Sequence, residues 1–221
     1  MYDKSDLFIL VLLIIGIMPS FFQERRNGME TIQRTACLGI RIYVPSKILT
    51  HVLVSIGLEV VFSAFNFLII NKQYGLKGSS MMLYSISEYQ YTPFDMSVLD
   101  FYFFIVLWKC IGFAIIAIVM TLIAEIVKNT YAVFLIIMGF ICGSLYLSGF
   151  DNGITVVEKV FTLASPFSLL KTGEMGITLK EINVCGHFIP LQYGMFFAQI
   201  VLIMIILAIT FLVEKGRRVI R

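Results

Sequence analysis

Long apolar runs fill most of the chain and are separated by more polar segments. A helix needs about 20 mainly apolar residues to cross a hydrocarbon core of about 30 Å. The runs are too long for barrel strands and do not alternate apolar with polar positions. The sequence therefore predicts a single all-α domain, a polytopic membrane bundle over residues 1–221, with five transmembrane helices at about 7–22, 48–70, 101–124, 131–150 and 193–213.

The composition agrees with a membrane protein. Hydrophobic residues make up 59% of the 221 residues, and charged residues make up only 14%. Soluble domains have about 45–50% apolar and about 25% charged residues. This balance excludes a soluble globular protein, a disordered chain and a nucleic-acid binder with a basic patch, so the expected surroundings are the lipid bilayer.

The placement of basic residues predicts the orientation. If all five runs cross, segments 23–47, 125–130 and 214–221 share one side, and they carry ten of the basic residues in 39 positions. The other side has six basic residues in 78 positions, and none of them is an arginine. Because Lys and Arg favour the cytoplasmic side, we expect the amino terminus outside and the carboxyl terminus inside. An uncleaved signal anchor would invert this topology, and the arginines oppose that alternative.

Candidate chemistry is sparse. On this topology His51 and His187 fall on opposite sides of the membrane, and the sequence has no phosphate-loop, zinc-protease or nucleophile-elbow motif. We therefore expect no catalytic residue, no metal site and no cofactor in this chain. The four cysteines fall in different compartments, which predicts no internal disulfide: Cys37 inside, Cys185 outside, Cys110 and Cys142 within spans.

The segment 23–47 predicts a short cytoplasmic amphipathic helix at the membrane surface. Asn27 and Gly28 form a turn signal, and apolar residues then recur at near-helical spacing up to about residue 40. The helix is expected to end before Pro45, because proline removes a helix hydrogen bond. The alternative is an ordinary interfacial linker held by anionic lipid.

A family resemblance starts in this segment. Glu24, Gly28 and Thr31 are followed by Pro45, Ser46 and Lys47 at the start of the next span. This order resembles the permease subunit of type-2 ATP-binding-cassette exporters, although Met29 and Glu30 separate Gly28 from Thr31. The order of spans and loops resembles that family along essentially the whole chain. The family has one further span at its amino end, so the chain is expected to correspond to a permease without its first span.

The resemblance implies a function. A separate ABC ATPase subunit would bind ATP and Mg, and a second permease copy or a paralogue would complete the transporter in a bacterial plasma membrane. The alternative is a stand-alone transporter or channel, which would need several polar residues along one pathway; a membrane-embedded enzyme would need clustered His, Asp or Glu. The expected ATPase-coupling residues are Glu24, Arg25, Arg26, Gly28, Glu30, Thr31 and Arg34.

Two opposite charges fall inside predicted spans. Glu59 lies about 16 Å from the inner end of the second span, and Lys109 lies about 18 Å from the inner side in the third. Because each charge alone is costly in lipid, we expect a Glu59–Lys109 ion pair or shared polar network facing the bundle interior. The alternative is that Lys109 extends outward and Glu59 is protonated or faces the permease partner.

The external segment 151–192 is apolar for a solvated loop. Its pattern predicts two short helices bent at Pro166, and the resemblance implies that they re-enter the bundle as a lid on the export path. An amphipathic loop lying along the membrane surface is the alternative.

Gly139 and Gly143 have the four-residue spacing that lets two helices approach closely. We expect packing within the chain, with a dimer interface as the alternative.

Overall fold

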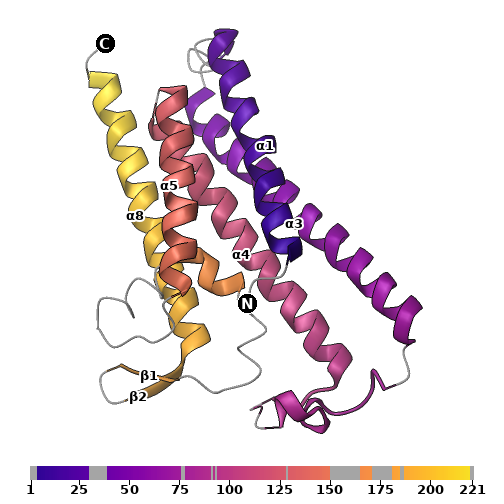
Figure 1. The fold of residues 1–221 in the computed structure, drawn as a ribbon. Helices are drawn as coiled ribbons and strands as arrows, with labels where there is room; N and C mark the ends of the chain where they lie inside the picture. Colours follow the sequence, from indigo (N-terminus) through magenta and orange to yellow (C-terminus); the bar gives the residue numbers. More distant parts are fainter. Residues whose placement is uncertain are drawn as a thin grey trace.

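A computed structural model of the chain shows a helical bundle (Figure 1). The structure describes residues 4–29, 39–75, 78–90, 92, 94–127, 129–149, 165–170, 181–184 and 187–219. The long helices are α1 (Lys4–Arg26), α3 (Gly39–Tyr74), α4 (Val98–Ile126), α5 (Thr130–Gly149) and α8 (Leu191–Val219). Short elements between them are the 3₁₀ helices η1 (Leu83–Ser85), η2 (Ser87–Tyr89) and η3 (Pro166–Leu170), and the strands β1 (Glu181–Val184) and β2 (His187–Pro190).

The five long helices lie at the places that the hydropathy pattern predicts. Three contain stretches long and apolar enough to cross a membrane, Ser5–Glu24, Tyr43–Gln73 and Val98–Ile126. The chain is therefore a membrane protein with a helical bundle. Within the described residues the apolar stretches of α5 and α8 are shorter, Tyr131–Gly143 and Phe196–Ile209, so membrane crossing by these two helices stays a prediction.

Helix α4 lies at the centre of the bundle, with α3 along one side and α1, α5 and α8 around the others (Figure 1). Phe113, Ile116 and Met120 of α4 are fully buried in one apolar cluster with Ile17 of α1 and Ile137 of α5. Only α8 packs mainly against a separate, smaller cluster on α4. Helix α3 makes most of its contacts with α4, whereas α1 contacts both α3 and α4.

The outward face of α3 is apolar and exposed. Large side chains along this face, including Leu53, Phe65 and Leu68, are more than half exposed. In water such a face would be unfavourable unless another protein surface covered it. Lipid tails are as apolar as leucine and can surround it directly. The exposed face therefore agrees with a helix at the edge of a bundle in a bilayer.

The second long helix begins earlier than the predicted span near residue 48, and it contains Pro45, while most of the amphipathic helix predicted to end before Pro45 lies outside the described residues. Helix α3 begins at Gly39 and continues through Pro45 without interruption. Proline at this position removes one helix hydrogen bond. Tyr43 and Lys47, on either side of Pro45, both bind Glu24 of α1, and these tertiary contacts hold the helix together across the proline.

The helix ends follow local signals. Gly28 and Gly75 have φ angles of 67° and 69°, and they close α1 and α3 in the left-handed conformation that glycine adopts without strain. The turn signal at Asn27 and Gly28 therefore coincides with a turn. At the start of α4, the Ser97 hydroxyl accepts from the Asp100 N–H and donates to the Asp100 carboxylate, which caps the helix.

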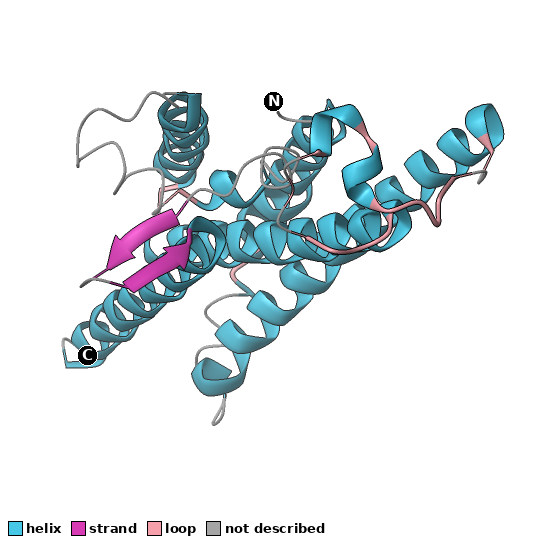
Figure 2. Cartoon of the chain, turned by 90° about the horizontal axis from the view of Figure 1, so that it is seen from below, coloured by secondary structure: helices cyan, strands magenta, loops and turns pink. Residues whose placement is uncertain are grey.

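The segment between β1 and α8 departs from the all-helical prediction. Strands β1 and β2 form an antiparallel hairpin that leads directly into α8, with Glu181 opposite Pro190 (Figure 2). Short strands in a hairpin give no long apolar or periodic run, so the hydropathy pattern does not distinguish them from loop.

Around Pro166 the structure describes only one of the two predicted helices. Pro166 begins η3, and the predicted preceding helix, residues 154–164, lies outside the described residues. Phe167 and Leu169 of η3 are fully buried. An apolar surface loop would leave these side chains exposed, so the burial favours a segment that turns back into the bundle.

Gly112 of α4 provides the space in which η3 docks. An added Cβ at Gly112 would lie 3.0 Å from Leu170 Cδ2 and 3.3 Å from Leu169 Cβ. Gly112 is 14 residues after Val98 and 14 residues before Ile126, so it lies at the middle of α4, about 21 Å from either end. The 3₁₀ helix therefore reaches the mid-height of the central helix.

Replacement of Gly112 by valine is expected to displace η3. The branched side chain would overlap Leu169 and Leu170, and overpacking of this kind lowers the free energy of unfolding by about 1–3 kcal/mol. The thermal unfolding midpoint of the purified chain in mild detergent measures the change. Gly57→Val in α3 is the matched control, because a Cβ at Gly57 meets no atom within 4 Å. Equal midpoints for the two variants would contradict the docking.

Candidate functional site

Arginine-bearing segments meet at one end of the bundle. Helices α1, α4 and α8 end there and α3 and α5 begin there, at the top of Figure 1. Arg26, Arg41 and Arg217 lie in the helix turns at this end. We call it the arginine end.

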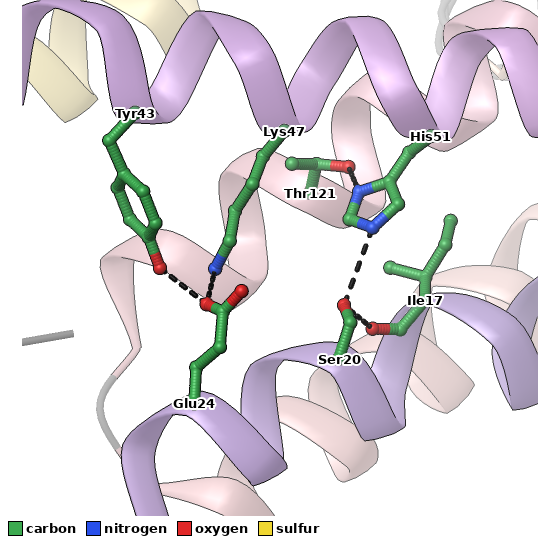
Figure 3. A network of polar contacts seen from close by, with 7 residues as sticks. All are labelled: Ile17, Ser20, Glu24, Tyr43, Lys47, His51 and Thr121. Atoms are coloured by element: carbon green, nitrogen blue, oxygen red, sulfur yellow. Dashed lines mark hydrogen bonds and ion pairs between the residues drawn. The ribbon is translucent and has the colours of Figure 1, made fainter. Parts of the chain in front are cut away.

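A polar network joins α1 to α3 at the arginine end (Figure 3). The Glu24 carboxylate accepts a hydrogen bond from the Tyr43 hydroxyl and forms an ion pair with Lys47 Nζ. The Lys47 ammonium also lies 4.0 Å from the centroid of the Phe21 ring, a cation–π contact. Glu24 comes from the last turns of α1 and Tyr43 from the first turns of α3, so the network ties together the two ends of the connecting segment.

His51 continues this network one turn further along α3. Its Nδ1 lies 2.9 Å from Thr121 Oγ1 of α4, and its Nε2 lies 3.4 Å from Ser20 Oγ of α1 (Figure 3). The Thr121 hydroxyl also donates to the Ala117 carbonyl, and the Ser20 hydroxyl donates to the Ile17 carbonyl. The imidazole is thus a buried polar link between three helices.

A second ionic contact lies near the amino end of α1. Lys109 Nζ of α4 lies 3.0 and 3.2 Å from the two carboxylate oxygens of Asp6. Both side chains are buried, with Asp6 1% exposed and Lys109 6% exposed. The hydropathy pattern assigns Asp6 to the external tail and therefore does not predict this contact. The sequence feature that could have indicated it is the position of Asp6 directly before an apolar run.

Glu59 of α3 is also buried, and Ser63 donates a hydrogen bond of 2.8 Å to its carboxylate. The Tyr102 hydroxyl of α4 donates to the Ser63 carbonyl over 2.7 Å. Ser63 and Tyr102 thus connect the surroundings of Glu59 on α3 to α4. A direct Glu59–Lys109 contact stays a prediction, since the structure gives Asp6 as a counter-ion of Lys109.

The predicted coupling residues are only partly described. Gly28 lies in the turn after α1, and Arg26 is exposed at the arginine end. Arg25 is placed in α1 by its backbone alone. Glu24 points toward α3, where Lys47 binds it. Glu30, Thr31, Arg34 and most of the predicted amphipathic helix lie outside the described residues.

The structure leaves Gly139 and Gly143 of α5 open. A Cβ built at either glycine meets no atom within 4 Å. Close helix packing within the chain at these two positions, as expected from their spacing, is therefore not seen in the described part of the bundle. The spacing stays available for a helix of another subunit.

A line of polar side chains runs along α3, and neither hydropathy nor the placement of charges predicts it. Every fourth residue is polar over twenty positions, although most residues between them are apolar. Repeated i, i+4 spacing is the signal that could have revealed it, because such residues are neighbours on a helix. We call this line the α3 polar stripe; its members are Tyr43, Lys47, His51, Ser55, Glu59 and Ser63.

Comparison with known proteins adds no relative. No protein-family model, no curated protein and no solved structure matches this chain. The resemblance to exporter permeases therefore rests on the sequence pattern alone. In the described residues no group of three or more His, Cys, Asp or Glu side chains is placed to hold a metal ion.

Removal of one partner from the Asp6–Lys109 contact is expected to destabilise the bundle. Asp6→Asn or Lys109→Met leaves the other charge buried, which lowers the free energy of unfolding by about 3–5 kcal/mol. The double variant Asp6→Asn/Lys109→Met should recover most of that loss. Denaturant unfolding in detergent micelles provides the double-mutant cycle, and losses that add within about 0.5 kcal/mol would contradict the pairing.

A parallel cycle with Glu59→Gln and Lys109→Met tests the predicted Glu59–Lys109 contact. Coupling in both cycles would indicate that Lys109 is shared between two carboxylates. Coupling in the Asp6 cycle alone would assign Lys109 to Asp6.

Proposed function

We propose that this chain is the membrane subunit of an ATP-driven exporter, in which a separate ABC ATPase drives transport. The proposal includes five membrane crossings, an external amino terminus, an internal carboxyl terminus and a bacterial plasma membrane. The observation that carries it is the contact of Glu24 with Tyr43 and Lys47. This contact makes the connecting segment a mechanical link between two helices, which is what an ATPase-driven segment requires.

Motion of the connecting segment would reach the whole bundle through existing contacts. An ATPase docked on residues 24–41 would move the ends of α1 and α3 together, because Glu24 joins them. Helix α3 lies along α4, and α4 contacts η3 at Gly112. Closure of two ATPase subunits on ATP would thereby change the packing at the middle of α4. There η3 would act as the lid of the export path.

A second permease subunit is part of the proposal. The open face at Gly139 and Gly143 of α5 supports a helix contact between subunits, since small residues allow close approach. The export path would then lie along the interface between the two permeases.

Coupling is expected to depend on the charged residues of the connecting segment. The double variant Glu30→Ala/Arg34→Ala should abolish stimulation of the partner ATPase while leaving insertion and folding intact, because these residues would lie at the water interface and contribute little to stability. ATPase assays on the purified complex measure the effect. The matched control is Lys72→Ala/Glu88→Ala, an exposed pair of opposite charges near the other end of the bundle. Normal stimulation in the first variant would refute the coupling role.

The orientation predicts which cysteine is accessible from outside. A membrane-impermeant thiol reagent added to intact cells should label Cys185 and leave Cys37 unlabelled, because the arginine-rich side is expected to be cytoplasmic. Mass spectrometry of the purified chain quantifies both modifications. Labelling of Cys37 would overturn the orientation and, with it, the docking of a cytoplasmic ATPase at the arginine end.

The α3 polar stripe favours a second candidate function, a stand-alone transporter or channel. Such a protein needs several polar residues along one pathway, and the stripe supplies them. The two functions are distinguished by the neighbouring genes and by affinity purification of the tagged chain in mild detergent. An adjacent ATPase gene and a co-purifying ATPase with a phosphate-binding loop support the exporter, and absence of both supports the stand-alone protein.

A further inference from the structure

Helix α3 changes from apolar to polar near its end opposite the arginine end. Large apolar side chains of α3 are exposed from Leu49 to Ile70, and Ile70 follows Leu49 by 21 residues, or about 32 Å along a helix. This length matches a hydrocarbon core of about 30 Å. Because Asn71, Lys72 and Gln73 follow directly, the last turn of α3 falls at the level of the lipid headgroups.

Helix α4 begins at the same level. Its first turn carries the exposed Asp100, and the first large apolar side chain exposed on this helix is that of Phe103. The exposed surface therefore changes from charged to apolar within one helical turn. The connection between α3 and α4 thus starts and ends beside the membrane surface, at the lower right of Figure 1.

The described part of this connection is folded onto the start of α4. The Leu99 N–H donates a hydrogen bond of 3.1 Å to the Ser79 carbonyl, and the Leu83 side chain is 1% exposed. These contacts hold the connection at the level of the first turn of α4. We call it the α3–α4 cap, and it comprises residues 78–90, 92 and 94–97.

Aromatic contacts fix the cap on α4 as well. The ring centroids of Tyr89 and Phe101 lie 5.5 Å apart, with the rings edge to face. The ring centroids of Phe94 and Phe104 lie 5.6 Å apart. Since Phe101 and Phe104 are one helical turn apart on α4, two rings of the cap are held by one face of the helix.

Beyond these contacts the cap exposes a group of large apolar side chains. Met81 is 59% exposed, Met82 47%, Tyr84 52% and Ile86 37%. Isolated exposed apolar side chains are common on protein surfaces, whereas a group of them marks an interaction with a membrane or another protein. The four side chains occupy only six consecutive positions, so they form such a group.

The position of the cap favours the membrane interface as the surface that these side chains meet. The cap continues the exposed apolar surface of α3 beyond the level at which Ile70 ends it. Tyrosine is enriched at membrane interfaces, where its ring meets apolar groups and its hydroxyl meets water. The charged residues in the sequence of the cap are Glu88 and Asp95, both acidic, so attraction to anionic lipid would not hold the cap.

We propose that the α3–α4 cap inserts its exposed apolar side chains into the bilayer interface opposite the arginine end. It thereby holds the adjoining ends of α3 and α4 at the membrane surface. Helix α3 makes most of its contacts with α4, and the cap adds a restraint on its tilt, since interfacial anchors help to set helix tilt. The inference requires neither an ATPase nor an exported substrate.

Fluorescence quenching in lipid nanodiscs tests the proposal. The full chain, with its four native cysteines changed to alanine, receives the single substitution Met82→Cys or Tyr84→Cys and a fluorescent label there. The lipid is phosphatidylcholine, part of it spin-labelled near the headgroup end of the acyl chain, and iodide is the quencher in water. Glu88→Cys is the matched control, because Glu88 is an exposed charged residue of the same cap.

We expect the spin-labelled lipid to quench Met82→Cys and Tyr84→Cys about twofold more strongly than Glu88→Cys, because inserted apolar groups lie about 5–10 Å into the boundary of headgroups and acyl chains. Iodide should quench the three sites in the opposite order. Addition of anionic lipid should leave both orders unchanged, because the sequence of the cap contains no basic residue.

Removal of apolar groups from the cap should withdraw it from the interface. Met81→Ser/Met82→Ser should lower the lipid quenching at Tyr84→Cys to the level of Glu88→Cys. Ser85→Ala/Ser87→Ala is the matched control, because it changes two exposed polar residues of the cap, and it should retain the quenching.

Two results would overturn the inference. Equal iodide quenching at Met82→Cys, Tyr84→Cys and Glu88→Cys would show that the cap faces water. Protection of the first two sites from both quenchers would show that a protein surface covers them, and protection that increases with the number of chains per nanodisc would identify a second copy of this chain. If either labelled variant aggregates, Ile86→Cys replaces it under the same criteria. Loss of ATPase coupling has no bearing on any of these outcomes.

Discussion

The absence of water inside the bilayer is the constraint on which the structure depends. A polar side chain in lipid has no solvent partner, so it must face the bundle and find a partner there. Lys109 forms an ion pair with Asp6, and Lys47 forms one with Glu24. The His51 imidazole is hydrogen-bonded to Thr121. These contacts determine how α1 and α3 are rotated about their axes, since the apolar faces of both helices would tolerate several rotations against lipid.

The polar contacts connect some helices of the bundle by ion pairs, whereas other helices are held by apolar contacts alone. Helix α1 is tied to α3 by Glu24 and to α4 by Asp6, so both its ends have ionic contacts. Helix α5 contacts α4 through apolar groups such as Ile137, and two glycines on it remain open. A force applied at the arginine end would therefore move α1 and α3 as a unit, while α5 retains a face that can meet another subunit. This division is compatible with the exporter proposal, in which the connecting segment acts on α1 and α3.

The docking of η3 shows how one missing side chain positions a functional segment. Gly112 lies at the middle of α4, and any added Cβ there would press on Leu169 and Leu170. Phe167 is also fully buried and adds van der Waals contacts to this arrangement.

The sequence by itself determined the membrane class, the positions of five helices and the grouping of Arg26, Arg41 and Arg217 at one end of the bundle. These features follow from length, hydropathy and charge, which are local properties of the chain. Tertiary structure alone decided that α3 runs through Pro45, that Lys109 meets Asp6, and that η3 reaches Gly112. A helix boundary at proline and a pairing between residues 103 positions apart depend on how helices are rotated and docked. Hydropathy contains no information on helix rotation, because a helix that is apolar on nearly all sides satisfies lipid in any orientation.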